Sequence, residues 1–369
     1  MRICFVGDPR SVHTQRWVEW FARTHPVALV RTASSPALPE IPGPTLPDGP
    51  SGPRGFRLVR WTSRLRDFLG AWSPDLLHAH YLNESGWLGA ASRFRPLVVT
   101  AWGSDVYQAP HASRMARVLN PWCVRQADHV TCDSEDLSRQ VVAWGVPAHR
   151  VTTVGWGVEV ERFRPGAGGG EWRRRLGIPP EVSVLLSPRQ WLPNSHIREM
   201  VEAFSLMDSR THLILKRLPA FEGEYAREVE GMVAASPAGE RIHMVAEEIP
   251  EGELPGLYGC ADAVVSLCGT DGTPVSVLEA MATGLPVVAL DVESLREWIT
   301  PGGGVLLAAP EPVTIARAVE GFLESPEAMD KAAHTNRAII LERASRAREM
   351  ARVEALYEAL VSVRSGEAL

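Results

Sequence analysis

Two acidic residues stand on either side of a predicted helix start, within the segment 263–290. Asp271 lies in a loop of small residues that follows an apolar strand, and Glu279 lies roughly one and a half turns into the next helix. Gly272 lets the backbone approach a ligand closely. Because N–H groups at a helix start bind phosphate oxygens and carboxylates accept hydrogen bonds from hydroxyls, this segment suits an anionic ligand rich in hydroxyls, such as a nucleotide with its ribose.

The helix in this segment carries clear boundary signals. Thr273 suits the N-cap, Pro274 suits the first helical position, and Gly284 suits the helix end. A structural role is the alternative, in which Asp271 caps the helix and Glu279 is a solvated surface residue. For Asp271 taken alone this alternative is the stronger one, but the whole arrangement favours a ligand site.

Short apolar strands alternate with amphipathic helices along most of the chain. This alternation predicts βαβ units and parallel sheets, hence an α/β fold. The predicted strands are Ile3–Val6, Val27–Val30, Asp75–His80, Leu97–Ala101, His129–Cys132, Val151–Val154, Val182–Leu186, Leu213–Leu215, Ile242–Val245, Ala263–Leu267, Val287–Leu290 and Val305–Leu307.

One break in the alternation divides the chain into two predicted domains. Residues 165–180 are rich in Pro and Gly, and we interpret them as a linker with one short helix. The N-terminal Rossmann-like domain is expected over 1–164 and the second over 181–345, with a final helix in 346–369. Ligands of such sheets bind beyond the carboxyl ends of the strands.

The bulk composition excludes several classes of protein. The net charge of −6 and the pI of about 6.0 argue against a nucleic-acid-binding protein. The five cysteines show no metal-ligand spacing and indicate reduced thiols in the cytoplasm. We find no signal peptide and no stretch of about 18–20 apolar residues, so any membrane contact would be peripheral, at the inner face. The helix Val12–Arg23, with Arg10, Arg16 and Arg23 as basic residues, is the candidate for that contact, although its pattern is also that of an ordinary packed surface helix, which is the stronger alternative.

The segment that begins at Asp271 resembles the donor-site motif of the retaining GT-B glycosyltransferases of family 4, also called glycosyl transferases group 1. In that family two acidic residues are separated by seven others, as in Asp271 and Glu279 here. Further segments of the chain resemble the family, and the likeness covers nearly its whole length. These segments are Leu257-Tyr258 with Ala261-Asp262, Gly157-Val158-Glu159 with Phe163-Arg164-Pro165, and the last helix with Leu356-Tyr357.

The resemblance implies a GT-B fold, with two doubly wound Rossmann-like domains facing a central cleft and a C-terminal helix that crosses back to the first domain. It also implies a nucleotide-sugar donor, with UDP-sugars the first expectation, and no cofactor or metal. Arg189, Asp271, Glu279 and His80 are the implied catalytic residues. The implied donor-binding residues are Gly7, Arg189, Lys216, Ile249, Asp271, Gly272, Thr273, Pro274, Val275 and Glu279.

The chain departs from the family pattern in the second domain. The first acidic residue is Asp271, one methylene shorter than the usual Glu. The usual lysine of the donor diphosphate site falls within 194–196, which reads Asn-Ser-His. Lys216 or Arg217, at the end of the next strand, could replace it. A solvated cation at a strand end is the alternative.

Two further departures concern the first domain. Trp102 stands where the family often has a histidine close to the reacting sugar, and Gly155-Trp156 replaces the usual Pro-Asn. His80, at the end of the previous strand, is the nearest histidine that could substitute, although it could equally be a core residue with His78. Both lie on the same side of their strand.

The loops after the first-domain strands are expected to bind the acceptor. His13, Trp102, Ser104 and Asp105 are the candidate residues, because mixed polar and aromatic loops suit a sugar ring. Gly7 is expected to form a tight turn. A surface position for His13 is the alternative.

The activity implied by the resemblance is retaining transfer of a hexose or N-acetylhexosamine to a sugar-containing or small-molecule acceptor, with the leaving group assisting attack on the same face. Three alternatives stay open. The chain could be a sugar phosphorylase or a sugar-nucleotide epimerase on the same scaffold, or a non-catalytic subunit that binds sugar nucleotides. The sequence sets no oligomeric state.

Overall fold

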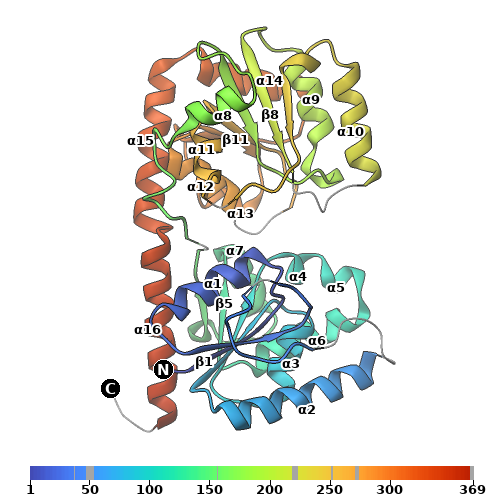
Figure 1. Ribbon diagram of the computed structural model, residues 1–369, viewed down its shortest axis with the longest axis vertical. Helices are drawn as coiled ribbons and strands as arrows, with labels where there is room; N and C mark the ends of the chain where they lie inside the picture. The colour runs from blue at the N-terminus through green and yellow to red at the C-terminus, as the bar shows by residue number, and fades with distance from the viewer. Residues whose placement is uncertain are drawn as a thin grey trace. The chain divides into compact units, whose positions relative to one another are not determined.

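The computed structural model describes residues 1–36, 38–46, 54–155, 157–217, 223–250, 252–270 and 274–365. The chain forms two compact units (Figure 1). Unit 1 comprises Met1–Trp156 together with Glu349–Leu369, and unit 2 comprises Gly157–Arg348.

Unit 1 is built on a six-stranded sheet whose neighbouring strands are all parallel. Its order is β2-β1-β3-β4-β5-β6, which reverses direction between β1 and β3. The carboxyl ends of β1 and β3 therefore flank the point where doubly wound sheets bind ligands. The strands are β1 (Ile3–Gly7), β2 (Val27–Arg31), β3 (Leu76–His80), β4 (Leu97–Ala101), β5 (His129–Cys132) and β6 (Val151–Thr153).

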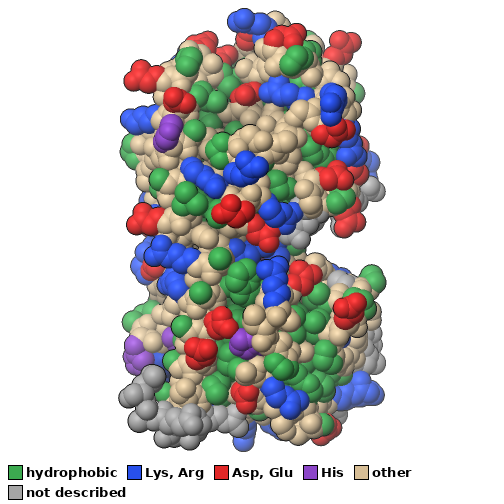
Figure 2. Space-filling view, turned by 60° about the vertical axis from the view of Figure 1, so that its left-hand side comes forward, with side chains coloured by type: hydrophobic (Ala, Val, Ile, Leu, Met, Phe, Trp, Pro, Cys, Tyr) green, Lys and Arg blue, Asp and Glu red, His purple; other side chains and the backbone are tan. Residues whose placement is uncertain are grey.

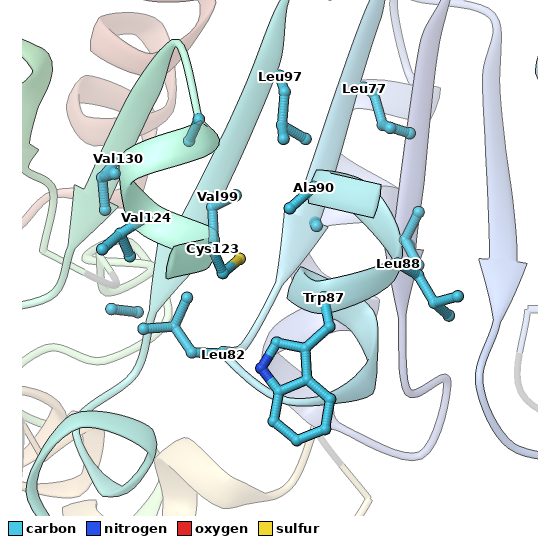
Figure 3. Packing of buried hydrophobic residues seen from close by; sticks show 14 of the residues in the cluster. Leu77, Leu82, Trp87, Leu88, Ala90, Leu97, Val99, Cys123, Val124 and Val130 are labelled. Carbon is cyan, nitrogen blue, oxygen red and sulfur yellow. The ribbon is translucent and has the colours of Figure 1, made fainter. Parts of the chain in front are cut away.

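Helices cover both faces of the first sheet. One face packs apolar side chains of the strands against α2, α3, α6 and α7, and Figure 3 shows part of this core, with Cys123 beside Val99. The helices of this unit are α1 (Val12–Ala22), α2 (Arg54–Trp72), α3 (Glu84–Ser92), α4 (Ser104–Tyr107), α5 (Ala109–Ala112), α6 (Arg114–Gln126), α7 (Glu135–Ala143) and most of α16 (Arg346–Ser365).

The C-terminal helix α16 packs on the other face of the first sheet. The hydroxyl of Tyr357 is hydrogen-bonded to Nδ1 of His78, and Nε2 of His78 lies 2.6 Å from Oγ1 of Thr100. The ring of Tyr357 also contacts Phe21 of α1, with centroids 5.1 Å apart. His78 is therefore a satisfied core histidine, and the expected return of the last helix to the first domain is confirmed.

Unit 2 contains a second six-stranded parallel sheet, in the order β12-β11-β10-β7-β8-β9. Counted from β7, this is the 3-2-1-4-5-6 order of the Rossmann fold, which reverses between β7 and β10. The strands are β7 (Ser183–Ser187), β8 (Thr211–Lys216), β9 (Ile242–Val245), β10 (Ala263–Ser266), β11 (Val287–Leu290) and β12 (Gly304–Leu307).

Two core clusters fill the faces of the second sheet. Helices α8, α11 and α12 pack on one face, and α9, α10 and α14 pack on the other. The helices are α8 (Gly169–Arg175), α9 (Ile197–Ser205), α10 (Glu224–Ala235), α11 (Leu254–Gly259), α12 (Val275–Thr283), α13 (Glu293–Arg296), α14 (Pro312–Leu323) and α15 (Pro326–Arg343). The expected pair of doubly wound α/β domains is thus confirmed.

The division into units differs from the domain limits expected from the sequence. Val158 and Phe163 are buried in the core of unit 2, although we assigned them to the first domain. Trp172 of α8 is buried in the same core, so the expected linker 165–180 is part of unit 2. Backbone hydrogen bonds between Val158 and residues Ala344 and Arg346 explain why the unit already begins at Gly157.

The surface of each unit is mixed in charge. Figure 2 shows basic and acidic side chains interspersed over the visible face of both units. Within the described ranges, none of the helices combines the length and the apolar character needed to cross a membrane.

Gly157 has a backbone conformation and a close contact that exclude a side chain. Its φ is +70°, and a Cβ atom there would lie 2.4 Å from Cα of Arg346, the first residue of α16. Gly166 has a similar φ of +73° but open space around it. The two glycines therefore separate backbone strain from steric overlap.

We expect Gly157→Ala to destabilise the protein by clearly more than Gly166→Ala, which should cost only the left-handed strain of about 1–2 kcal/mol. Thermal and denaturant unfolding of the two variants measures the difference. Equal losses would show that the approach of Gly157 to Arg346 contributes nothing to stability.

Candidate functional site

The start of helix α12 lies one residue later than the sequence indicates. Pro274 is the N-cap, with an extended backbone (φ −73°, ψ 111°), and the helix begins at Val275. The prediction of Pro274 as the first helical position was wrong, because a ψ near 111° does not continue into a helix. Gly284 ends the helix in the left-handed conformation, as expected. Asp271, Gly272 and Thr273 lie outside the described residues.

Glu279 is buried on an otherwise apolar helix. Every residue from Val277 to Thr283 is buried, and Glu279 is 4% exposed. Burial lowers the pKa of Lys216, at the carboxyl end of β8, and the charge of Glu279 acts in the opposite direction and raises it. The charges of Glu279 and Lys216 therefore interact at the carboxyl end of the sheet, where a buried carboxylate benefits from a positive charge nearby.

Arg189 reaches the same helix from the neighbouring strand. It lies two residues after the end of β7, and its Nη1 donates a long hydrogen bond of 3.5 Å to Oγ of Ser276, the second residue of α12. The strand order reverses between β7 and β10, so the loop with Arg189 and the start of α12 occupy the ligand-binding end of this sheet.

The segment that replaces the family lysine also lies at this end. The N–H of Gly269 donates to the carbonyl of Asn194 at 2.9 Å, and a Cβ on Gly269 would lie 3.7 Å from Nε2 of His196. His196 in turn lies 3.1 Å from Glu199. An amide and an imidazole therefore border the loop after β10 where the family has a lysine.

Lys216 and Arg217 have different surroundings. The guanidinium of Arg217 lies 3.4 Å from Glu230 and stacks over the ring of Trp191 at 5.3 Å. These contacts give Arg217 a place in the core, so Lys216 is the cation beside Glu279. Ile249, the remaining described donor candidate in this unit, is half-buried against the core that includes α12.

His80 lies at the reversal point of the first sheet, next to Gly7. A Cβ atom on Gly7 would lie 3.5 Å from Cβ of His80 and 2.9 Å from Cγ2 of Thr14. The ring of His80 is enclosed by Trp17 at 5.2 Å and Trp102 at 5.6 Å, and it is 1% exposed. Among the described residues, neither ring nitrogen finds a hydrogen-bond partner.

The surroundings of His80 keep its ring neutral. Burial, with a smaller contribution from the charge of His13, lowers the pKa of His80 to about 3. Trp102 contacts both histidines, since its ring centroid lies 5.2 Å from that of His13. The tryptophan that replaces the family histidine therefore packs between the buried His80 and the half-buried His13.

Two family models match this chain and together span most of it. The Glycosyl transferase 4-like domain matches residues 11–157, and Glycosyl transferases group 1 matches residues 170–338. The chain belongs to the group 1 glycosyltransferases. The resemblance identified from the motif of Asp271 and Glu279 is thereby confirmed.

Individual relatives are similar to this glycosyltransferase at low identity. The D-inositol 3-phosphate glycosyltransferase of Geodermatophilus obscurus is 28% identical over 278 residues, which cover 70% of this chain and 61% of the relative. The alignment thus spans less than two thirds of the relative.

Solved structures show the same fold. Anabaena HepE in complex with UDP has a TM-score of 0.82 at 18% identity, and sucrose-phosphate synthase of Thermosynechococcus elongatus has 0.84 at 20%. Both cover 98% of this chain and 100% of their own. The two sheets therefore form a GT-B fold.

Asp105 has a different role in this glycosyltransferase from the expected acceptor contact. It is 0% exposed, and its carboxylate accepts hydrogen bonds from the N–H of Leu82 at 2.8 Å and of Trp102 at 3.0 Å. Burial raises its pKa to about 6, against the lowering effect of these hydrogen bonds. These hydrogen bonds hold two loops together, and the buried carboxylate presents no exposed surface to an acceptor.

Tyr81 contacts two of the acceptor candidates and is a residue that the sequence analysis did not name. It follows β3 with a φ of +76°, its hydroxyl lies 2.7 Å from Oγ of Ser104, and its ring centroid lies 5.7 Å from that of Trp102. Ser104 is exposed, as an acceptor residue should be. The position of Tyr81 directly after a strand was the available signal, but its conformation is not readable from the sequence.

The pairing of Lys216 with Glu279 can be tested by titration, because the chain contains two lysines, Lys216 and Lys331. We expect Glu279→Gln to lower the pKa of Lys216 further, since the carboxylate that raises it is lost while the burial remains. NMR of the protein with 13C-labelled lysine, read at the Cε positions of the two residues, follows each titration separately. Lys331, exposed on α15, is the internal reference. An unchanged Lys216 titration would contradict the pairing.

The buried His80 should make the protein sensitive to acid. Its folded pKa of about 3 lies below the ordinary value of 6.5, so on acidification the unfolded state binds a proton first. The free energy of unfolding should therefore fall by about 2 kcal/mol between pH 6.5 and pH 4.5 because of this residue. Denaturant unfolding at pH 6.5 and pH 4.5 should show a smaller loss of stability for His80→Asn than for the wild type. His111→Asn, at an exposed position, should keep the full drop, and an equal drop in both variants would contradict the assignment.

Proposed function

We propose that this protein transfers a hexose or N-acetylhexosamine from a UDP-sugar to a sugar-containing or small-molecule acceptor, with retention of configuration. The observation that carries the proposal is the group formed at one end of the second sheet by Arg189, the start of α12 and the pair of Lys216 and Glu279. This group offers positive charge for a diphosphate and a carboxylate for hydroxyls.

The diphosphate is the part of the donor that needs positive charge. When the sugar leaves, negative charge grows on the β-phosphate, and preformed donors at that position lower the barrier. Arg189, Lys216 and the N–H groups at Val275 and Ser276 are the groups of this chain that would supply them. The proposal needs no metal or cofactor for this step.

Glu279 is assigned two tasks in this proposal. Its carboxylate accepts hydrogen bonds from a pair of donor hydroxyls, as on a ribose, and its charge raises the pKa of Lys216 against the lowering effect of burial. Asp271 is proposed to contact the donor sugar, with a reach one methylene shorter than in the family pattern.

The reaction proceeds on one face of the sugar. The acceptor hydroxyl attacks from the side on which the nucleoside diphosphate leaves, and the departing phosphate oxygen takes the hydroxyl proton. His80 is neutral and enclosed by rings, so we assign it a positioning role behind Trp102 and His13, and not a proton transfer.

Known relatives support the donor class. Solved structures of HepE hold UDP, UDP with glucose, and UDP-glucose. The relative from Geodermatophilus obscurus carries the name of a glycosyltransferase. These similarities favour a UDP-sugar over GDP-, ADP- or TDP-sugars as the first donor to test.

A non-catalytic subunit that binds sugar nucleotides is the second candidate. Two observations favour it, namely Trp102 in place of the family histidine and Asn194 with His196 in place of the family lysine. Such a subunit would bind the donor without turnover. A phosphorylase would instead depend on free phosphate, and an epimerase would turn over a sugar nucleotide without any acceptor.

The donor site can be tested with two matched carboxylate variants. Glu279→Gln should weaken UDP-sugar binding about tenfold to a hundredfold, because hydrogen bonds to a charged group contribute about 1.5–3 kcal/mol. Glu228→Gln, which alters an exposed carboxylate on α10, should bind as the wild type does. A panel of nucleotide sugars in a thermal-shift assay measures binding, since ligand binding stabilises the folded state.

Transfer is measured as UDP release in the presence of candidate acceptors. Arg189→Ala should reduce the turnover about 100-fold to 1000-fold, as expected for the loss of one donor to the developing charge. Unchanged UDP-sugar binding in Glu279→Gln would overturn the site assignment. Binding of the UDP-sugar without release of UDP in the presence of any acceptor, phosphate included, would favour the non-catalytic subunit.

A further inference from the structure

We propose that unit 1 binds its acceptor as an uncharged sugar ring, on an aromatic corner formed by Tyr81 and Trp102 with the hydroxyl of Ser104 at its edge. This inference rests on the proposed glycosyl transfer and names the class of acceptor. Tyr81 is the new member of the site, and the corner is a specificity determinant for the acceptor.

The corner consists of two half-buried rings with polar groups beside them. The centroids of Tyr81 and Trp102 are 5.7 Å apart with their planes at 64°, so the rings form a bent surface. Oη of Tyr81 and Oγ of Ser104, 2.7 Å apart, lie at the exposed edge. Aromatic faces pack against the C–H groups of a sugar ring, while hydroxyls at the edge exchange hydrogen bonds with sugar hydroxyls.

The backbone of Tyr81 is held in a strained conformation. A φ of +76° costs a non-glycine residue of the order of 1–3 kcal/mol and persists only where the surroundings enforce it. The N–H of Tyr81 donates to the carbonyl of Thr100 at 2.9 Å, and its own carbonyl accepts the N–H of Gly86 at 3.1 Å. A Cβ on Gly86 would lie 2.9 Å from that carbonyl, so glycine permits the contact. The turn aims the ring of Tyr81 toward Trp102.

A buried network fixes the second ring relative to the first. The carboxylate of Asp105 accepts the N–H groups of both Leu82 and Trp102, the residues that continue the two loops. The carbonyl of Asp105 accepts a hydrogen bond from Asn120 at 2.8 Å, and Asn120 in turn accepts one from Trp87 at 2.8 Å. Trp87 belongs to the packed core shown in Figure 3. The corner is therefore rigid before any ligand binds.

The groups that the described contacts place at the corner are rings, hydroxyls and an imidazole, which favour a neutral ligand over a phosphorylated one. Arg10, in the loop after β1, holds Asp8 with its Nε at 3.0 and 3.2 Å and its Nη2 at 2.7 Å from the carboxylate oxygens. The positive charge of Arg10 is thus already offset within its own loop. His13 borders Trp102 with an edge-to-face contact of 5.2 Å, which adds an imidazole that can exchange a hydrogen bond. A phosphate would need a cation that is not committed elsewhere.

The experiment is saturation-transfer difference NMR on the full-length protein with saturating UDP. The probes are the methyl glycosides of glucose, galactose, mannose and N-acetylglucosamine, compared with glucose 6-phosphate and an inositol phosphate. We expect saturation transfer to the ring C–H protons of at least one neutral glycoside, and weaker transfer to the phosphorylated compounds.

Variants of the corner test which groups carry the binding. Tyr81→Phe removes one hydroxyl and should weaken the glycoside about threefold to tenfold. Trp102→Ala should weaken it about tenfold or more, and Trp102→Phe should restore part of the loss. Trp20→Phe, which alters a half-buried tryptophan of α1 packed against Arg23, should bind as the wild type does. A cooperative thermal unfolding transition like that of the wild type confirms that each variant is folded.

The outcomes separate the acceptor inference from the proposed function. Binding of the phosphorylated compounds alone, with UDP-sugar binding intact, would overturn the neutral acceptor and leave glycosyl transfer standing. Glycoside binding that is the same in the wild type, Tyr81→Phe and Trp102→Ala would overturn the aromatic corner. Glycoside binding at the corner without stabilisation by any UDP-sugar would support the corner and overturn the proposed donor.

Discussion

The buried carboxylate of Glu279 sets the requirement that organises the donor end of unit 2. A charge placed on a helix whose neighbouring residues are all buried must meet a positive group, because desolvation is otherwise uncompensated. Lys216 supplies positive charge from the end of β8. Burial lowers the pKa of Lys216, and the charge of Glu279 raises it. Arg189 approaches the first turn of the same helix from β7. The chemistry of the site thus follows from where three parallel strands end.

Unit 1 uses a buried carboxylate in the opposite way. The carboxylate of Asp105 accepts hydrogen bonds from backbone N–H groups of Leu82 and Trp102. These hydrogen bonds hold two loops together. A carboxylate that is fully enclosed by backbone donors can position other residues but cannot bind a ligand. The contrast between Asp105 and Glu279 shows that the partner, and not the residue type, decides whether a buried acid belongs to the scaffold or to the site.

Local patterns in the sequence carry the fold and part of the site. The strands, the end of α12 at Gly284 and the place of Arg189 after β7 could be predicted, because each depends on neighbouring residues only. The role of Asp105 could not, since its partner Leu82 lies on another loop. The conformation of Tyr81 depends on Thr100 and Gly86 together. Lys216 and Arg217 have different surroundings because Arg217 stacks on Trp191 and pairs with Glu230. These contacts are not readable from neighbouring residues in the sequence.

These contacts also connect the departures of this chain from the family pattern. With Asn194 and His196 at the usual place of the lysine, the loop after β7 brings one permanent cation, Arg189, to the start of α12. Arg217 is buried beside Trp191. Lys216, at the end of β8, is the neighbouring cation whose pKa is raised by the charge of Glu279. The positive charge is therefore supplied from a neighbouring strand instead of the same loop. Because the charge of Glu279 raises the pKa of this lysine, the proposed function gives one glutamate both hydroxyl recognition and support of the positive charge, and replacing it should affect two steps that the usual lysine would keep separate.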